Sequence, residues 1–199
     1  MSAVGRPRAF DMEKVLEAAA LLFWEHGYEA TSLAQLREAT GLSSASLYGT
    51  FGSKHGLFER AVEHYMAGPG SVTAVVDDET LSPREAIAQM LHRSIDMQTD
   101  PAHPRGCLVS LAGTVGNHGK DEGAAHDTMK RWRATGRARI RACVVRSVAA
   151  GELPEDTDVD AIASVIHSFL LGVSTQACDG MSAQALHAAA DAVLAMWRA

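Results

Sequence analysis

The chain has 199 residues, of which 47% are hydrophobic, and a formal net charge of −6. This length and composition suit a globular protein with a sizeable core in one or two domains. The acidic balance gives no global sign of nucleic-acid binding. No apolar run approaches the roughly 18 residues of a membrane span, and the N-terminus lacks a signal-peptide pattern.

Cysteine usage indicates the compartment. The three cysteines are odd in number and widely spaced, at Cys107, Cys143 and Cys178. This argues against a disulfide framework and for a reducing environment. We therefore expect a cytoplasmic protein that has no membrane partner.

The first two predicted helices are short and well punctuated. Apolar residues recur on one face of the first helix, which Gly27 closes. Ser32 followed by Gln35 forms a capping box, and this opens a second helix that stops at Gly41.

The third helix is unusually short and carries little apolar bulk. Ser43 can cap it, and Leu47 and Phe51 are its only inward pair at i, i+4. Gly52 ends this helix, and Ser53 caps a fourth.

The remaining chain also predicts helices. Residues 67–83 read as a boundary or loose connection, and a lone strand there is discounted because it has no partner strand. Helices then follow from 83 to about 99, within 107–115, from about 122 to 150, and twice more before the C-terminus. The expected fold is all-α, with about nine helices and no sheet.

Two short helices joined by Gly41-Leu42 form a helix-turn-helix, whose second helix enters the DNA major groove. Close contact with base edges favours small side chains, because bulk would hold the backbone off. Serine and threonine hydroxyls can serve base edges or phosphates. The exposed face of the third helix fits this description with Ser44, Ala45, Ser46, Tyr48, Gly49 and Thr50.

Lys54 is the sharpest single residue of this region. It follows an N-cap, where the helix dipole disfavours a cation by roughly 0.3–1 kcal/mol, and a bound phosphate reverses that sign. Thr31 and Ser32 offer a similar device at the second helix, one hydroxyl capping and the other free. Arg6 and Arg8, ahead of the first helix, are candidates for a neighbouring groove or the DNA backbone.

Other interpretations of these residues stay open. Residues 1–66 hold six basic and eight acidic side chains, so a generic basic patch is absent. DNA binding then requires the acidic side chains of the first helix to face away from the reading helix. Tyr48 also suits a packing role, the serines suit caps and turns, and Arg6 and Arg8 suit a disordered tail.

Residues 5–65, which include "FWEHGYEATS", "GLSSASLYGTFGSK" and "LFERAV", resemble the N-terminal domain of TetR-type transcriptional regulators in order and spacing. Later stretches such as "PRGCLVSLAG" resemble the family's C-terminal domains more loosely. The resemblance implies a ligand-responsive regulator, most often a repressor, that binds a palindromic double-stranded DNA operator as a homodimer. It implies a DNA-binding domain over 1–52, a linking helix over 53–67, and an effector-binding and dimerisation domain over 68–199.

Site residues follow from the resemblance position by position. The implied DNA contacts are Thr31, Ser32, Ser43, Ser44, Ser46, Tyr48, Thr50 and Lys54. The last two helices of the family form a four-helix dimer interface, here Ile166, Phe169, Leu170, Val173, Leu186, Val193, Leu194 and Trp197. One apolar stripe per helix does not distinguish dimer packing from packing inside the domain.

The effector is expected to be a small hydrophobic molecule, because methionine and tryptophan supply adaptable apolar walls. The candidate contacts are Met90, Ser94, Met97, Leu111, Thr114, His118, Met129, Trp132 and His167. Each of them is also compatible with an ordinary core position.

Rival functions have weaker support. Cys107 follows Gly106 at a probable helix start beside Arg105, where its pKa would fall, so a redox-responsive regulator is an alternative. No compact metal-ligand spacing, phosphate-binding loop or nucleophile elbow is present, so we expect no metal, no cofactor and no enzyme. A helical protein-interaction module that does not bind DNA is the alternative from another class, supported only by the acidic N-terminal domain.

Overall fold

The computed structural model describes residues 11–111 and 120–197, and in these residues it is all-helical, with nine α-helices, one 3-10 helix and no strand. The N-terminal helices are α1 (Met12–Ala30), α2 (Leu33–Thr40), α3 (Ser44–Phe51) and α4 (Lys54–Ala67). The predicted caps Ser32, Ser43 and Ser53 each accept a backbone N–H three residues on. Gly27, with φ of 77°, interrupts α1 where the sequence predicted its end.

The stretch after α4 is more ordered than the sequence suggested. Residues Pro69–Asp77 form a 3-10 helix, η1, which packs against α5 and α7. Val76 is buried there, and Arg146 Nη2 donates to its carbonyl oxygen at 2.8 Å. The expectation of a loose connection was therefore wrong, because tertiary packing stabilises a segment that is weakly patterned on its own.

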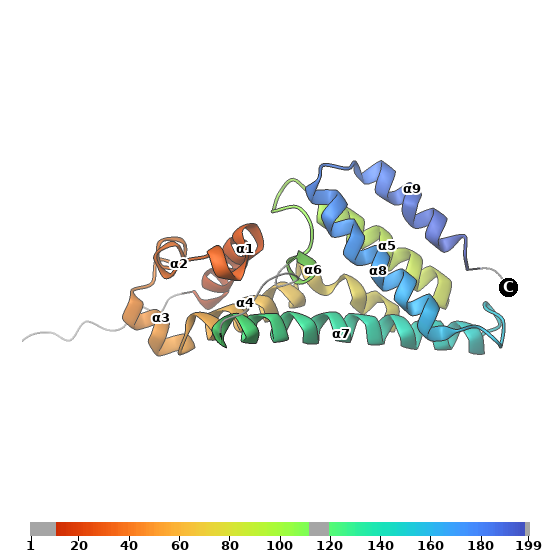
Figure 1. The fold of residues 1–199 in the computed structure, drawn as a ribbon, viewed down its shortest axis with the longest axis horizontal. Helices are drawn as coiled ribbons and strands as arrows, with labels where there is room; N and C mark the ends of the chain where they lie inside the picture. The colour runs from red at the N-terminus through yellow and green to blue at the C-terminus, as the bar shows by residue number, and fades with distance from the viewer. Residues whose placement is uncertain (1–10, 112–119, 198–199) are drawn as a thin grey trace, which may run out of the picture.

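The C-terminal part is built around one long helix. Its elements are α5 (Pro83–Thr99), α6 (Leu108–Leu111), α7 (Lys120–Ala149), α8 (Val159–Cys178) and α9 (Ala183–Leu194). Figure 1 shows α1–α4 gathered at one end, with α7 running from α4 beneath α5 and α8 to the other end. Helix α7 therefore both borders the N-terminal helices and underlies the C-terminal bundle.

Two hydrophobic cores hold these elements together. One lies among η1, α5, α7, α8 and α9. The other begins in α1–α4 around Phe23 and Phe58 and continues into α6 and α7 through Leu108 and Met129. Because this second core includes residues of α1–α4 and of α6 and α7, apolar packing spans the predicted domain boundary. Burying each such side chain stabilises the fold by about 1.5–3 kcal/mol.

The apolar stripes of α8 and α9 belong mainly to the protomer's own core. Six of the eight predicted interface residues are buried inside the single chain: Ile166, Leu170, Val173, Leu186, Leu194 and Trp197. Trp197 Nε1 also donates to Ser147 Oγ at 2.9 Å. Only Phe169 and Val193 are partly exposed. Six of the eight residues therefore already pack inside the protomer, and the interface itself stays a prediction.

Helix α8 also corrects the expectation that no apolar run is long enough for a membrane. Its 20 residues would suffice by length and composition, and 33% of its most apolar window is buried in the chain. It packs against α5, α7 and α9, as the core helix of a globular protein does.

Candidate nucleic-acid interface and effector cavity

Helices α2 and α3 form the predicted helix-turn-helix. Gly41 takes the left-handed conformation at φ 67°, which reverses the chain between the helices. Leu36 and Leu47 are fully buried and anchor the two helices to the core. Phe51, at the end of α3, also packs against this core, and the other side chains of α3 face outward.

The outward face of α3 is small, hydroxyl-rich and uncharged. Ser44, Ser46 and Thr50 are exposed, and Tyr48 is 47% exposed. Ser43 caps the helix and shares a 3.0 Å hydrogen bond between its Oγ and that of Ser46. Tyr48 is therefore about half exposed, which leaves part of its ring available to a ligand and is also compatible with the half-buried packing role.

Thr31 differs from its prediction. Its side chain is buried, and its Oγ1 donates to the carbonyl oxygen of Gly27 at 2.6 Å. The hydroxyl that was expected to be free therefore stabilises the bend that ends α1. Ser32 beside it is exposed and caps α2 through a reciprocal bond with Gln35.

Lys54 lies at the first position of α4 with its ammonium over an aromatic ring. Its Nζ is 4.3 Å from the centroid of Tyr28, a cation–π contact worth about 0.5–1 kcal/mol at an exposed site. The contact holds the ammonium near the first turn of α4, where the N-cap Ser53 leaves amides pointing outward. The sequence reasoning had not given Tyr28 this role.

Gly56 is a second residue that the sequence reasoning missed. A Cβ at this position would lie 2.1 Å from the carbonyl oxygen of Phe51, the last residue of α3. Only glycine permits this close approach, which brings the first turn of α4 against the end of α3. A glycine inside the first turn of a predicted helix was the available signal.

The predicted arm residues Arg6 and Arg8 lie outside the described residues. Helix α3 itself carries no charged residue, and the four acidic side chains of α1, Glu13, Glu17, Glu25 and Glu29, are exposed.

Comparison with known proteins gives the family. Residues 15–61 match the family model "Bacterial regulatory proteins, tetR family", and residues 83–196 match "Tetracyclin repressor-like, C-terminal domain". The chain belongs to the TetR family. It is a helix-turn-helix DNA-binding transcriptional regulator rather than an enzyme or a protein-interaction adaptor.

Individual relatives agree along nearly the whole chain. The HTH-type transcriptional repressor ComR of Escherichia coli K12 is 32% identical over 195 residues, which cover 97% of this chain and 91% of the relative. A cysteine variant of the TetR regulator CifR, solved with 26-bp double-strand operator DNA, superposes with a TM-score of 0.89 at 37% identity. That match covers 96% of this chain and 100% of CifR.

A small cavity lies in the C-terminal part and is lined by residues of α4, η1, α5, α6, α7 and α8. It has a volume of about 60 Å³, and Ser94, Trp132 and His167 of the predicted set line it. The other described members do not: Met90 and Met129 are fully buried in the cores, and Met97 and Leu111 lie elsewhere. Thr114 and His118 lie outside the described residues.

Polar groups at the cavity include residues that the sequence reasoning missed. Gln98 is buried, its Nε2 donates to Ser94 Oγ at 2.7 Å, and its Oε1 accepts from Ser174. Arg133 also lines the cavity, and its Nη1 donates to the carbonyl oxygen of Val109 at 2.8 Å. The spacing of Ser94 and Gln98, one turn apart on an apolar face, was the available signal.

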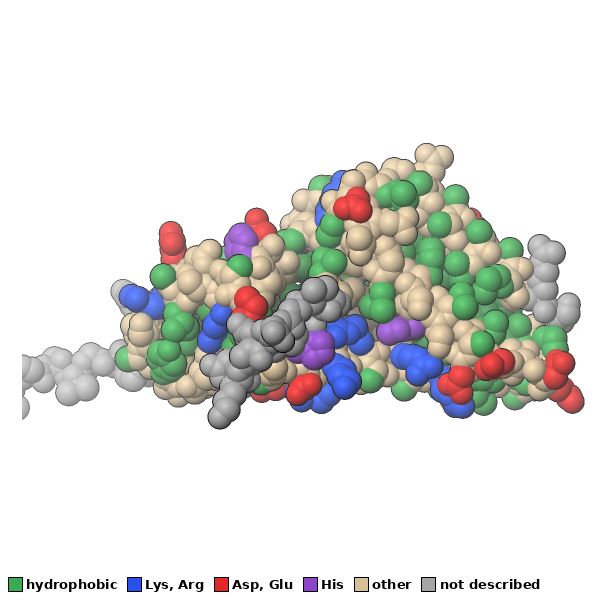
Figure 2. Space-filling view, viewed as in Figure 1, with side chains coloured by type: hydrophobic (Ala, Val, Ile, Leu, Met, Phe, Trp, Pro, Cys, Tyr) green, Lys and Arg blue, Asp and Glu red, His purple; other side chains and the backbone are tan. Residues whose placement is uncertain are grey.

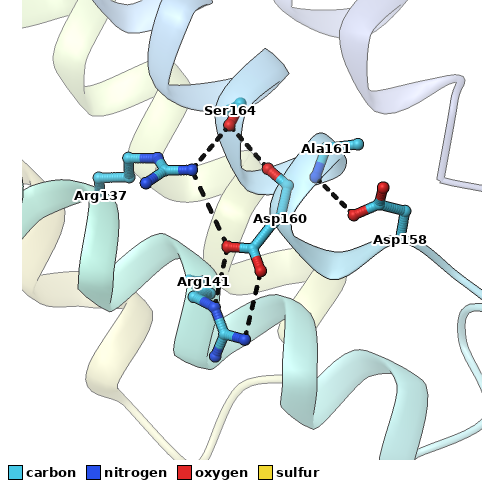
Figure 3. A network of polar contacts seen from close by, with 6 residues as sticks. All are labelled: Arg137, Arg141, Asp158, Asp160, Ala161 and Ser164. Atoms are coloured by element: carbon cyan, nitrogen blue, oxygen red, sulfur yellow. Dashed lines mark hydrogen bonds and ion pairs between the residues drawn. The ribbon is translucent and has the colours of Figure 1, made fainter.

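The pKa of His167 is lowered, first by burial and then by the positive charges of Arg137 and Arg133. Arg137 is itself held in a network on the α7–α8 surface. It donates to Ser164 Oγ at 2.9 Å, and Asp160 bonds Arg141 in the same network (Figure 3). Figure 2 shows Lys and Arg side chains along the α7 side of the molecule, with Asp and Glu side chains among them.

Cys107 lines the same cavity. The hydroxyl of Tyr65 donates to its sulfur at 3.4 Å, and burial raises the pKa of Tyr65 well above its usual value. Among the described residues, no group of three or more His, Cys, Asp or Glu side chains is arranged to hold a metal ion. The comparisons give no support to the redox alternative.

Proposed function

We propose that this regulator is a repressor that binds a palindromic operator as a homodimer and is released when a small molecule enters the C-terminal cavity. The observation that carries the proposal is the outward face of α3, which is uncharged and small and is followed by Lys54 at the start of α4. The names of its relatives support it, since ComR is a repressor and the CifR structure contains operator DNA. Such a protein acts in the cytoplasm, where the DNA is.

The DNA contacts divide into two kinds. Ser44, Ser46, Tyr48 and Thr50 would meet base edges and nearby phosphates, because their side chains are exposed along one helix. Lys54 and Ser32 would meet phosphates at the starts of α4 and α2, where helix N-termini favour anions. Arg6 and Arg8 remain candidates for a neighbouring groove. Because the N-terminal segment is acidic overall, affinity depends on this local geometry.

A second copy would cover the exposed apolar side of α8 and α9. Val165 on α8 is 42% exposed, and Met181 and Met196 flank α9 with 41% and 48% of their surface exposed. Phe169 and Val193 border the same helices and are partly exposed. Pairing these faces buries apolar surface, and each Å² buried stabilises the dimer by about 25 cal/mol. The dimer then presents two α3 helices to half-sites about 34 Å apart.

The proposal also assigns a role to each part of the chain. We assign DNA binding to residues 1–52, a link to 53–67, and effector binding and dimerisation to 68–199. The dimer would have two states that differ in the distance between its two DNA-binding domains. An effector that binds one state more tightly would shift the dimer toward that state. A coupling free energy of about 1–3 kcal/mol would change the affinity for the operator about 5–150-fold.

A footprint on the DNA upstream of the protein's own gene tests this function. We expect two protected half-sites, centred about one helical turn or a multiple apart. Tyr48→Ala should remove both while size-exclusion chromatography still gives a dimer. Protection by Tyr48→Ala equal to that by the wild type, or no protection at any operator, would refute the assignment.

A further inference from the structure

The cavity in the C-terminal part is chemically one-sided. Among the described residues that line it are one arginine and one histidine but no aspartate or glutamate. Trp132, Leu170 and Leu171 contribute to an otherwise mainly apolar wall. A neutral hydrophobic ligand would use this wall alone and would leave the two basic groups without a role in binding.

The two basic groups come from neighbouring helices. Arg133 lies on α7 and His167 on α8, and both line the same small space. Arg133 is half-buried, and the acceptor at 2.8 Å from its Nη1 is the neutral carbonyl oxygen of Val109. A guanidinium stays protonated at neutral pH, so Arg133 brings a positive charge to the cavity wall.

A neutral donor lies on α5. Ser94 Oγ accepts from Gln98 Nε2 at 2.7 Å, so the Ser94 hydroxyl keeps its own proton for donation. Gln98 is fixed by Ser174 on α8. Ser94 is thus held by Gln98, which Ser174 holds in turn, and it lines the same cavity as Arg133.

We propose that the cavity binds a small organic acid, whose carboxylate is held by Arg133, His167 and Ser94 and whose short apolar part packs on Trp132 and Leu170. This rests on the proposed function only in naming the acid as the effector. Hydrogen bonds between ionised partners are about twice as strong as neutral ones, so an acid gains from Arg133 what an amide cannot. Benzene occupies a cavity of about 150 Å³, so a volume of about 60 Å³ selects a smaller molecule.

The test compares two probes of nearly equal shape, propionate and propionamide, by calorimetric titration of the full chain at constant ionic strength. We expect propionate to bind at least about tenfold more tightly, which corresponds to about 1.4 kcal/mol. Acetate with acetamide extends the series to a smaller size. If no acid in this series binds more tightly than its amide, the proposal is overturned.

Two variants locate the effect. Arg133→Gln removes the charge but keeps a donor for Val109, and we expect the preference for the acid to fall to about one. Arg139→Gln is the matched control. Arg139 lies on the same helix but does not line the cavity, and its Nε is 3.1 Å from Asp77 Oδ2. Equal acid preference in the wild type and Arg133→Gln would overturn the proposal, as would an equal loss in both variants.

Operator binding is measured separately, first without ligand. Acid binding that leaves operator affinity unchanged would refute the effector role in the proposed function and leave the acid site standing. Release of the operator by the amides as readily as by the acids would refute the acid site instead. The two failures are therefore distinguishable.

Discussion

Arg131 of α7 bonds Glu59 of α4, with 3.1 Å between Nη2 and Oε1, and this pair ties the helix that begins with Lys54 to the helix that lines the cavity. Thr128 of α7 donates to the same carboxylate at 3.2 Å. Trp132, which follows Arg131 on α7, borders both the cavity and the groove beside the Arg131–Glu59 pair. A ligand that displaces Trp132 would therefore disturb the contact between α7 and α4.

The pair should matter more for coupling than for stability. Both side chains are substantially exposed, and such pairs contribute about 0–1 kcal/mol. We expect Arg131→Gln to leave the unfolding midpoint nearly unchanged and to weaken operator binding a few-fold, because α4 is held less firmly. Arg139→Gln, which breaks an exposed pair to η1 instead, is the control. Identical operator affinities for the two variants would remove this role from Arg131.

Gly56 should be intolerant of any side chain. Because a Cβ would meet the Phe51 carbonyl at 2.1 Å, we expect Gly56→Ala to lower the free energy of unfolding by about 1–3 kcal/mol. Gly49→Ala is the matched change, since a Cβ at Gly49 meets nothing within 4 Å. Better helix propensity should raise its stability by about 0.5–1 kcal/mol. Urea unfolding of the two variants checks both signs, and equal stabilities would contradict the close approach.

Thr31 is expected to support the fold rather than to contact DNA. Thr31→Val removes the donor to the Gly27 carbonyl and should cost about 0.5–1.5 kcal/mol of unfolding free energy. Thr31→Ser keeps the donor and should retain most of that stability. At a temperature where all three proteins are folded, their operator affinities should agree. A large loss of affinity in folded Thr31→Val would restore the threonine to the DNA interface.

We expect His167 to make the stability of the protein depend on pH. Its pKa is lowered in the folded protein, so below its ordinary value of about 6.5 the unfolded chain binds the proton more readily. The native state should therefore lose stability as the pH falls through the window just below 6.5, and the contribution should be absent above it. Melting curves at pH 7.5 and 5.5 should show a larger drop for the wild type than for His167→Gln. The same drop in both proteins would contradict the assignment.

Local chemistry made the N-terminal elements predictable. Serine caps followed by glycine stops define α2 and α3, because both act within a few residues of the helix end. Contacts between distant segments did not show in the pattern. Val76 is buried only because α5 and α7 cover η1, and Thr31 turns inward only because α1 bends at Gly27.

The same limit applied to the apolar stripes and the cavity. Leu186 and Val193 lie on the same helix, yet the first is fully buried in the protomer while the second is partly exposed. The helical period gives a face but not what covers it. The sequence also did not predict a role for Arg133, because its place at the cavity depends on how α6, α7 and α8 pack together.

The most direct test of the account is the salt dependence of operator affinity for Lys54→Ala and Arg60→Ala. Arg60 lies on the same helix and pairs with Glu63 at the surface, so its loss removes one charge from α4 without touching the first turn. The logarithm of the operator affinity falls linearly with the logarithm of the salt concentration. We predict that Lys54→Ala makes this slope shallower by about 0.9 per protomer and that Arg60→Ala leaves it unchanged. Equal slopes for the wild type and Lys54→Ala would contradict the placement of a phosphate at the start of α4.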